Sequence, residues 1–499
     1  MNSSTLETPF VDWYSLSPFI VLLVGALVLI GAGSLTPKWP RGAYAGVASI
    51  TSGAAITLLA LRLGDLGEGQ NLTLMKDSLA LDQFGWWAMM AICAAVLLSS
   101  LVTSDVLSRN DVDGPETYAL YLTAAIGAGM MVVSNNLLIS FLGIETLSLS
   151  LYVLAASNRR RAASQESGLK YFLLGGFASA FLLYGIALVY GATGETQISE
   201  IGSLLGAEVS LPRNDLLLLT GVALLFVGFA FKVALVPFQS WTPDVYEGAP
   251  THVTGLMASV GKIAAVVAMV RLFVVAFPSR ADDWRPVVFV VAILTLVVGS
   301  VLAVVQTNVK RMLAYSSISH AGFMLVGLEA AGRVSSAGAS QGTSAVLIYV
   351  MLYSVLVVGT FAVTAIVAGD RGGASLDDFR GLAARRPVLA MAMTILLLAQ
   401  AGVPLTSGFV AKFGVIRAAV ATESYVLALA AMIAAVVAAY LYLRIMVSMW
   451  LSDPVDETRP VVPFATGVTI AVSVAVTLVL GVFPAVLLDS AEVFAVLTR

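Results

Sequence analysis

The chain has 499 residues, of which 59% are hydrophobic and only 11% are charged, and its formal net charge is −3. Soluble domains average about 25% charged residues, so this composition excludes a soluble globular protein and indicates a polytopic membrane protein. One cysteine and two histidines are too few for an intrachain disulfide, for a cysteine-ligated iron–sulfur cluster or, by themselves, for a conventional zinc site.

Windows of about 19–20 apolar residues mark the candidate membrane spans. We expect fourteen, near residues 16–35, 43–63, 80–103, 116–134, 136–156, 168–191, 215–236, 251–277, 286–307, 311–331, 343–369, 387–418, 424–450 and 462–486. The acidic segment before the first span is the wrong flank for a cleaved signal peptide, so we expect a retained helix. The predicted fold class is an all-α polytopic membrane protein without a separate soluble domain.

The loops differ in their content of lysine and arginine, which sets membrane orientation. With an external N-terminus, the internal loops would hold thirteen of these residues and the external segments seven. Because the number of spans is even, we expect both termini on the external side.

The most informative stretch is 227–262, which places two lysines inside apolar runs on either side of a polar insert. One run carries Lys232 and then reaches Pro237, which lacks an N–H and breaks the helix. The next helix begins near Thr251 and carries Lys262 about three turns in. A lysine at mid-membrane depth costs about 2.5–3.5 kcal/mol, so the two lysines suggest an ion path. Alternatively, they pair with nearby acids and only hold helices together.

A second interrupted span repeats this theme. The span 387–418 is broken at Gly402 and Pro404, and Lys412 follows one to two turns later. Interrupted segments at corresponding places in two halves are typical of inverted-repeat transporters, although no residue-level repeat is evident.

Two further ionisable residues lie in neighbouring spans. Glu145 sits near the middle of its span, and a buried carboxylate needs a cation, for which Lys232 is the candidate. A purely structural ion pair is the alternative. Lys170 lies near the start of its span, where it either takes part in the path or reaches the interface by snorkelling.

His320 lies about ten residues into a span and has Tyr315 and Ser316 close by in sequence. An imidazole flanked by hydroxyl groups suits a hydrated proton wire, because its free pKa is near neutrality. A hydrogen-bonded core histidine is the alternative. No Walker A sequence and no dinucleotide-binding glycine motif occurs, and none of these side chains can transfer hydride or electrons.

Charged residues near the span ends complete the set. Asp244 and Glu247 follow the first break, and we expect them to be solvated, to pair with an internal lysine or arginine, or to form part of an internal proton-uptake route. Arg271, Arg417 and Arg444 lie close enough to span ends to snorkel, and we expect structural roles for them.

Three stretches of these residues carry a family resemblance: FKVALVPFQSWTPDVYEGAP, RMLAYSSISHAGFMLVGL and AGVPLTSGFVAKF. The chain resembles the antiporter-like membrane subunits of respiratory complex I, a family shared with multi-subunit cation/proton antiporters and membrane-bound hydrogenases. The resemblance runs roughly from Glu116 to Arg444, and the N-terminal hundred residues match only weakly. Lys412 stands where a sister subunit typically carries a glutamate.

The resemblance implies a role for each matching residue. Glu145 and Lys232 match the acid–lysine pair, Lys262 the central relay lysine, His320 a histidine of the polar axis, Lys412 the lysine leading to the external half-channel, and Lys170 a further lysine. It also implies fourteen helices with two inverted five-helix repeats and two broken helices. The corresponding parts are 1–115 (three helices), 116–277 (first repeat), 278–450 (second repeat) and 451–499 (last helix).

The implied function is proton translocation in the membrane arm of an NADH:quinone oxidoreductase in a bacterial inner or plasma membrane. This chain would hold no cofactor, and NADH, FMN, iron–sulfur clusters and quinone would belong to partner subunits. Expected partners are an adjacent antiporter-like subunit M, small subunits such as K and J, and the lipid bilayer, but no nucleic acid. The alternatives are a subunit of a Na⁺/H⁺ antiporter or membrane-bound hydrogenase, and a non-pumping scaffold.

Overall fold

The computed structural model describes residues 11–36, 39–40, 42–65, 72–109, 114–207, 215–333, 338–369, 374–455, 458–490 and 497. Its principal elements are α1 (Trp13–Leu35), α2 (Ala43–Asp65), β1 (Leu72–Leu74), β2 (Leu79–Leu81), α3 (Gln83–Arg109), α4 (Pro115–Val133), α5 (Leu137–Ala155), α6 (Ala162–Thr193), α7 (Ile198–Gly206), α8 (Asp215–Val233), α9 (Trp241–Gly248), α10 (Thr251–Arg271), α11 (Ala281–Val304), α12 (Val309–Ala331), α13 (Gly338–Ala368), α14 (Leu382–Arg385), α15 (Pro387–Ala401), α16 (Ser407–Ala421), α17 (Tyr425–Leu451), α18 (Phe464–Val482) and α19 (Ala485–Leu488). A π-helical turn, Leu272–Ala276, extends α10, and short 3₁₀ turns lie at Pro278–Arg280 and Leu376–Phe379.

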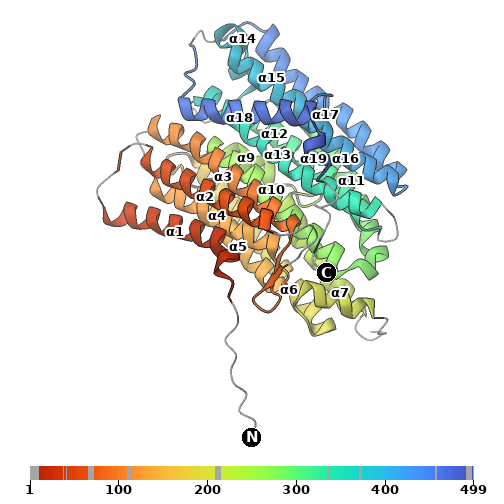
Figure 1. The fold of residues 1–499 in the computed structure, drawn as a ribbon. Coiled ribbons are helices and arrows are strands. Elements are labelled where there is room, and N and C mark those ends of the chain that lie inside the picture. The colour runs from red at the N-terminus through yellow and green to blue at the C-terminus, as the bar shows by residue number, and fades with distance from the viewer. Residues whose placement is uncertain are drawn as a thin grey trace.

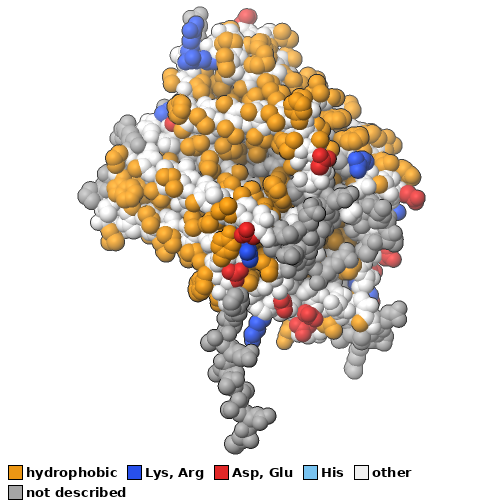
Figure 2. Space-filling view, viewed as in Figure 1, with side chains coloured by type: hydrophobic (Ala, Val, Ile, Leu, Met, Phe, Trp, Pro, Cys, Tyr) orange, Lys and Arg blue, Asp and Glu red, His pale blue; other side chains and the backbone are white. Residues whose placement is uncertain are grey.

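The helices form one bundle in which α10, α12 and α13 lie between the first and last helices (Figure 1). The central helices are also the most buried. In the most apolar 18-residue segment of each helix, the buried share is 100% in Thr251–Ala276 and 89% in α13, but only 33% in α1, α6 and α18. A helix that is apolar on all sides belongs inside a bundle, which explains the central place of α10. Figure 2 shows a mostly apolar face, with its few charged side chains mainly near the margins.

Among the described residues, twelve helices are long and apolar enough to cross a membrane. The two other predicted spans correspond to α12, whose sequence is more polar, and to 387–418, which is divided between two helices of 15 residues each. The prediction of an all-α chain missed a small antiparallel hairpin, in which Leu72 of β1 pairs with Leu81 of β2. It also missed the surface helix α7.

Both predicted helix breaks are present. Helix α8 ends at Val233, four residues before Pro237, and the chain resumes as α9 at Trp241. Helix α15 ends at Ala401, Gly402 adopts a left-handed φ of +89°, and α16 begins at Ser407. A Cβ at Gly408 would lie 1.7 Å from the Ala399 carbonyl oxygen, so only glycine allows this close return of the chain.

The connections gather at two ends of the bundle. At one, which we call the hairpin end, Leu79 bridges to Ser134 and Asn136 bridges to Gln197. At the other, which we call the basic end, Asn308 bridges to Ser375. Each of these bridges joins loops that the lysine and arginine bias assigns to the same side.

Candidate functional site

Lys232 is buried in the last turn of α8 and faces helices α5 and α6. Its ammonium donates hydrogen bonds to the Ser148 hydroxyl at 2.8 Å and to the Tyr171 hydroxyl at 3.3 Å, and it lies 5.4 Å from the Tyr171 ring centroid. Tyr171 in turn stacks on Trp241, the first residue of α9, at 4.5 Å. Lys232 therefore contacts Tyr171, and the stacking of Tyr171 on Trp241 connects it to α9, the segment beyond the break.

Glu145 lies on α5, one helical turn before Ser148, and is half-buried. It accepts a hydrogen bond from the Ser179 hydroxyl of α6. No ion pair within 4.0 Å joins its carboxylate to Lys232 among the described residues, and the Ser148 hydroxyl, which accepts from Lys232, donates to the Ile144 carbonyl instead. The acid–lysine relation expected from the sequence stays a prediction, and its geometry here is indirect.

Lys262 lies deep in α10, where it contacts both sides of the bundle. Its ammonium donates to the carbonyl of Val233 at 3.2 Å and to the carbonyl of Ser317 on α12 at 2.5 Å. The Ser317 hydroxyl accepts from Tyr353 of α13 at 2.9 Å. Lys262 therefore contacts both the first break and Ser317, the residue whose hydroxyl is bonded to Tyr353.

His320 continues that hydroxyl cluster. Its Nδ1 lies 2.7 Å from the Tyr349 hydroxyl and its Nε2 3.2 Å from the Tyr442 hydroxyl of α17. Tyr442 also lies 2.6 Å from the Ser316 hydroxyl. Both ring nitrogens thus have partners that can donate or accept, and Tyr315, which packs against the apolar core, is not one of them.

Lys412 lies in the second turn of α16, and its side chain turns back toward the second break. Its ammonium donates to the carbonyl of Ala401, the last residue of α15, at 3.0 Å, and lies 4.8 Å from the ring centroid of Phe323. Phe323 stacks on Tyr349, a partner of His320. The structure therefore brings Lys232, Lys262, His320 and Lys412 into one buried series.

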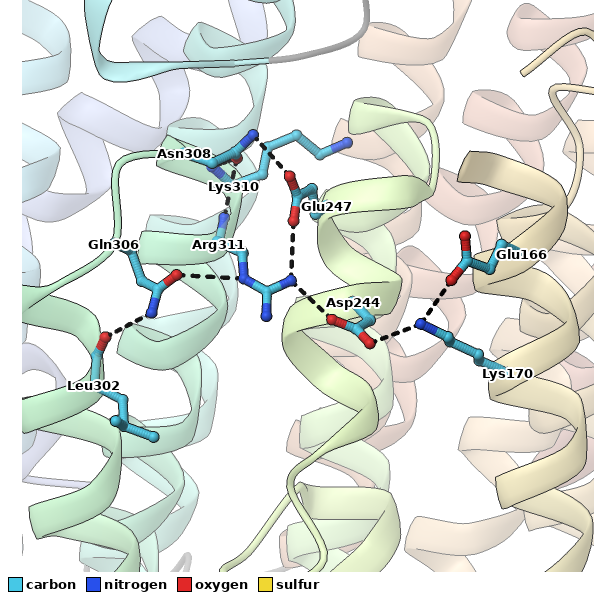
Figure 3. A network of polar contacts seen from close by, with 9 residues as sticks. All are labelled: Glu166, Lys170, Asp244, Glu247, Leu302, Gln306, Asn308, Lys310 and Arg311. Carbon is cyan, nitrogen blue, oxygen red and sulfur yellow. Dashed lines mark hydrogen bonds and ion pairs between the residues drawn. The ribbon is translucent and has the colours of Figure 1, made fainter. Parts of the chain in front are cut away.

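At the basic end, charged residues form an exposed network (Figure 3). Lys170 of α6 pairs with Glu166 at 2.7 Å and with Asp244 of α9 at 2.9 Å. Arg311 of α12 pairs with Asp244 at 2.7 Å and with Glu247 at 3.0 Å. Lys170, with 43% of its side chain exposed, therefore lies apart from the buried series, and the expected pairing of Asp244 and Glu247 with cations is confirmed.

The charges around Asp244 determine its ionisation. Partial burial acts to raise the pKa of this carboxyl, but hydrogen bonds from Lys170 and Arg311 outweigh burial and hold the pKa below its usual value. The same contacts join α6, α9 and α12, since Asp244 is shared between the two cations.

Sequence reasoning missed or misplaced three buried charges. Lys310 and its neighbour Arg311 were both expected in an internal loop. Lys310 is instead buried and donates to the carbonyl of Ala249 at 2.5 Å. Arg271 does not snorkel to an interface but forms a buried, bidentate ion pair with Asp82 at 2.6 and 2.7 Å, which agrees with the structural role expected for it. Glu329, at the end of α12, is also buried.

The partners of these three buried charges could not be read from the sequence, because each pair is distant along the chain; Arg271 and Asp82, for example, are 189 positions apart.

The described residues contain no group of three or more His, Cys, Asp or Glu side chains that could hold a metal ion. Lysine, histidine, tyrosine and serine instead make a series of proton donors and acceptors. The chemistry available to this arrangement is proton exchange.

Comparisons with known proteins agree with this arrangement. The family described as NADH:quinone oxidoreductase/Mrp antiporter, TM matches residues 134–438. The chain is 40% identical to NADH-quinone oxidoreductase subunit N of Saccharopolyspora erythraea, over 98% of this chain and 99% of that one. It is 39% identical to the subunit N of Mycobacterium tuberculosis, over 99% and 100% of the two chains.

Solved structures show the same fold. A chain of respiratory complex I from Thermus thermophilus superposes with a TM-score of 0.79 and 30% identity, covering 95% of this chain and 99% of that one. A chain of an archaeal membrane-bound sulfane sulfur reductase reaches a TM-score of 0.84 at 24% identity, covering 97% and 98% of the two chains. At that identity, the second match bears on the fold alone.

Proposed function

The chain belongs to the NADH-quinone oxidoreductase subunit N family, and on this premise we propose that it moves protons along the buried series from Lys232 through Lys262 and His320 to Lys412. It is a multi-pass antiporter-like subunit of respiratory complex I in a bacterial membrane, involved in proton translocation, and partner subunits hold the redox cofactors. The resemblance noted in the sequence is thereby confirmed.

One observation carries the proposed path: each helix break places a lysine on the last carbonyl before it. Lys262 bonds to Val233, and Lys412 bonds to Ala401. A lysine held by neutral carbonyls has no fixed counter-ion, so its proton can be passed on when a neighbouring charge changes. The hydroxyl groups around His320 lie between these two lysines and supply the intermediate donors and acceptors.

In the proposed sequence of events, a charge arriving near Glu145 perturbs Lys232. Its proton then passes to Lys262, on to the cluster of His320 and finally to Lys412. Asp244 and Glu247 would belong to the uptake side, next to Lys170. The basic end would face the cell interior and both termini would lie outside, as the lysine and arginine bias suggests.

The finer architecture is part of the same proposal. We assign residues 116–277 and 278–450 to two inverted five-helix repeats, flanked by 1–115 and 451–499, with α12 and the α15–α16 pair completing fourteen spans. The two breaks, in 233–241 and 401–407, support this division, because each carries a lysine on its terminal carbonyl. NADH, FMN, iron–sulfur clusters and quinone would be bound by partners, and subunits M, K and J would be neighbours.

A Lys412→Met substitution in the assembled complex tests the path. It keeps much of the apolar volume but removes the titrating group, so NADH-driven acidification of vesicles should fall roughly tenfold or more, since a positioned acid–base group contributes about 10²–10⁴-fold. Lys412→Arg should also fail, because a guanidinium stays protonated, whereas Lys412→Glu should retain part of the activity.

Two rival functions predict different outcomes. A Na⁺/H⁺ antiporter subunit would use the same lysines but would not co-purify with flavin and iron–sulfur subunits. A scaffold would leave pumping unchanged in Lys412→Met, provided that a native gel shows a complete complex. Full activity of that variant would refute the path proposed through Lys412.

A further inference from the structure

A second buried carboxylate lies outside the series described above. Glu329 is in the last turn of α12, at the hairpin end, and only 3% of its side chain is exposed. Arg285 of α11 donates to one of its oxygens at 2.7 Å, and the Ser424 hydroxyl donates to the other at 2.7 Å. Both oxygens of this buried carboxylate therefore accept hydrogen bonds, one from α11 and one from the residue that precedes α17.

These residues line a pocket of about 430 Å³, which also includes Arg333 and an apolar wall with Phe289. The exposed carboxylates Asp282 and Glu423 lie at its rim. The pocket is formed by the first turns of α11, the end of α12 and the turn before α17. It thus gives a buried acid a route to solvent at the end of the bundle opposite the Lys170 network.

Helix α12 connects this pocket to the proton series. Glu329 follows His320 by nine residues and Phe323 by six, which correspond to about 13 and 9 Å along a helix that rises 1.5 Å per residue. The ammonium of Lys412 lies 4.8 Å from the Phe323 ring. Glu329 is consequently the next ionisable residue on α12 beyond the point that Lys412 contacts.

We propose that Glu329 receives protons from the Lys412 region and releases them to water in this pocket. A carboxylate oxygen gains a proton as an ammonium upstream loses one, and it then gives that proton to water, so no other reactant is needed. Arg285 and Ser424 hold the carboxylate in place between the two transfers. The charged groups that face Glu329 or line the pocket with it are Asp282, Arg285, Arg333 and Glu423.

This inference rests on the proposed function, and the test separates the two. Glu329→Gln keeps the size and one of the two acceptor oxygens but cannot take up and release a proton, so NADH-driven acidification should fall at least about tenfold. Glu329→Asp should keep much more activity. The matched control is Glu200→Gln, an exposed carboxylate of α7 at the same end of the bundle, which should behave like the parent.

The melting temperature and a native gel distinguish proton transfer from a structural ion pair. An unchanged melting temperature with lost pumping supports the inference, whereas normal pumping by Glu329→Gln overturns it. The same vesicles are prepared with Lys412→Met. If that variant also pumps normally, the proposed function fails; if it is slow while Glu329→Gln is not, only the role of Glu329 fails.

Access of water to the pocket is tested separately with a cysteine at position 424. The native Cys93 is buried, so an impermeant, charged thiol reagent should react little with the parent. Ser424→Cys should react from the hairpin-end side at least about tenfold faster than Ser354→Cys, which is buried inside α13. Equal, slow reaction at both positions would contradict an aqueous pocket.

Discussion

The ammonium of Lys262 donates a 3.2 Å hydrogen bond to the carbonyl of Val233, which ends helix α8. In a continuous helix this carbonyl would accept from the residue four positions on, but that residue is Pro237 and has no N–H. The lysine therefore supplies the hydrogen bond that the proline removes. Lys262 thus contributes both to the stability of the helix break and to the proposed proton transfer.

Substitutions of Lys262 should separate these two contributions. Lys262→Met leaves the Val233 carbonyl unpaired and should cost about 1–3 kcal/mol in the free energy of unfolding, and it should also stop pumping. Lys262→Arg keeps a donor but stays protonated at any accessible pH, so it should be more stable than the Met variant and equally inactive. Melting temperatures and vesicle acidification provide the readouts; an active Arg variant would contradict the relay.

The first lysine offers a comparison between its direct and indirect partners. Ser148→Ala removes the 2.8 Å acceptor of Lys232, and hydrogen bonds to charged groups are worth about 1.5–3 kcal/mol. We expect slower pumping with an assembled complex. Glu145→Gln should also slow pumping, and Glu145→Asp should be milder because the charge survives. If Glu145→Gln pumps normally, the acid–lysine relation is structural at most.

The buried pair of Arg271 and Asp82 should matter for stability rather than for proton transfer. Asp82→Asn leaves a buried guanidinium without its anion, and breaking such a pair costs about 3–5 kcal/mol. Removing the cation as well, in Asp82→Asn/Arg271→Met, should recover part of that loss. Thermal unfolding of the purified complex measures both, and a double variant less stable than Asp82→Asn would be the contrary result.

The network at the basic end should respond to acid. Because its cations hold the pKa of Asp244 below the usual value, the stabilisation is complete above the unfolded value of about 3.9 and is lost as pH falls through the folded value. At pH 7 the parent should therefore have a higher melting temperature than Asp244→Asn. The corresponding difference in the free energy of unfolding should be at most about 1 kcal/mol, because the pair is so exposed.

That difference should narrow below about pH 4. Asp453→Asn, a change at another exposed carboxylate near the same end, serves as the control and should show no such convergence. A difference in melting temperature that stays constant with pH would show that the Asp244 charge contributes nothing to the joining of α6, α9 and α12.

Local sequence by itself determined the membrane class, the position of nearly every long helix and both breaks. Runs of apolar residues have no alternative to helix in lipid, and Pro237 and Gly402 interrupt a helix whatever surrounds them. The same rule identified Lys232, Lys262, His320 and Lys412, because an ionisable residue in an apolar run is costly and conspicuous.

Only the tertiary structure decided which groups meet. It paired Arg271 with Asp82 across 189 positions, buried Lys310 and Glu329 although both lie near helix ends, and placed Ser148 rather than Glu145 against Lys232. Such partners depend on helix rotation and on which helices are neighbours. A pattern of hydrophobicity along one helix carries no information on either, since packing between helices fixes both.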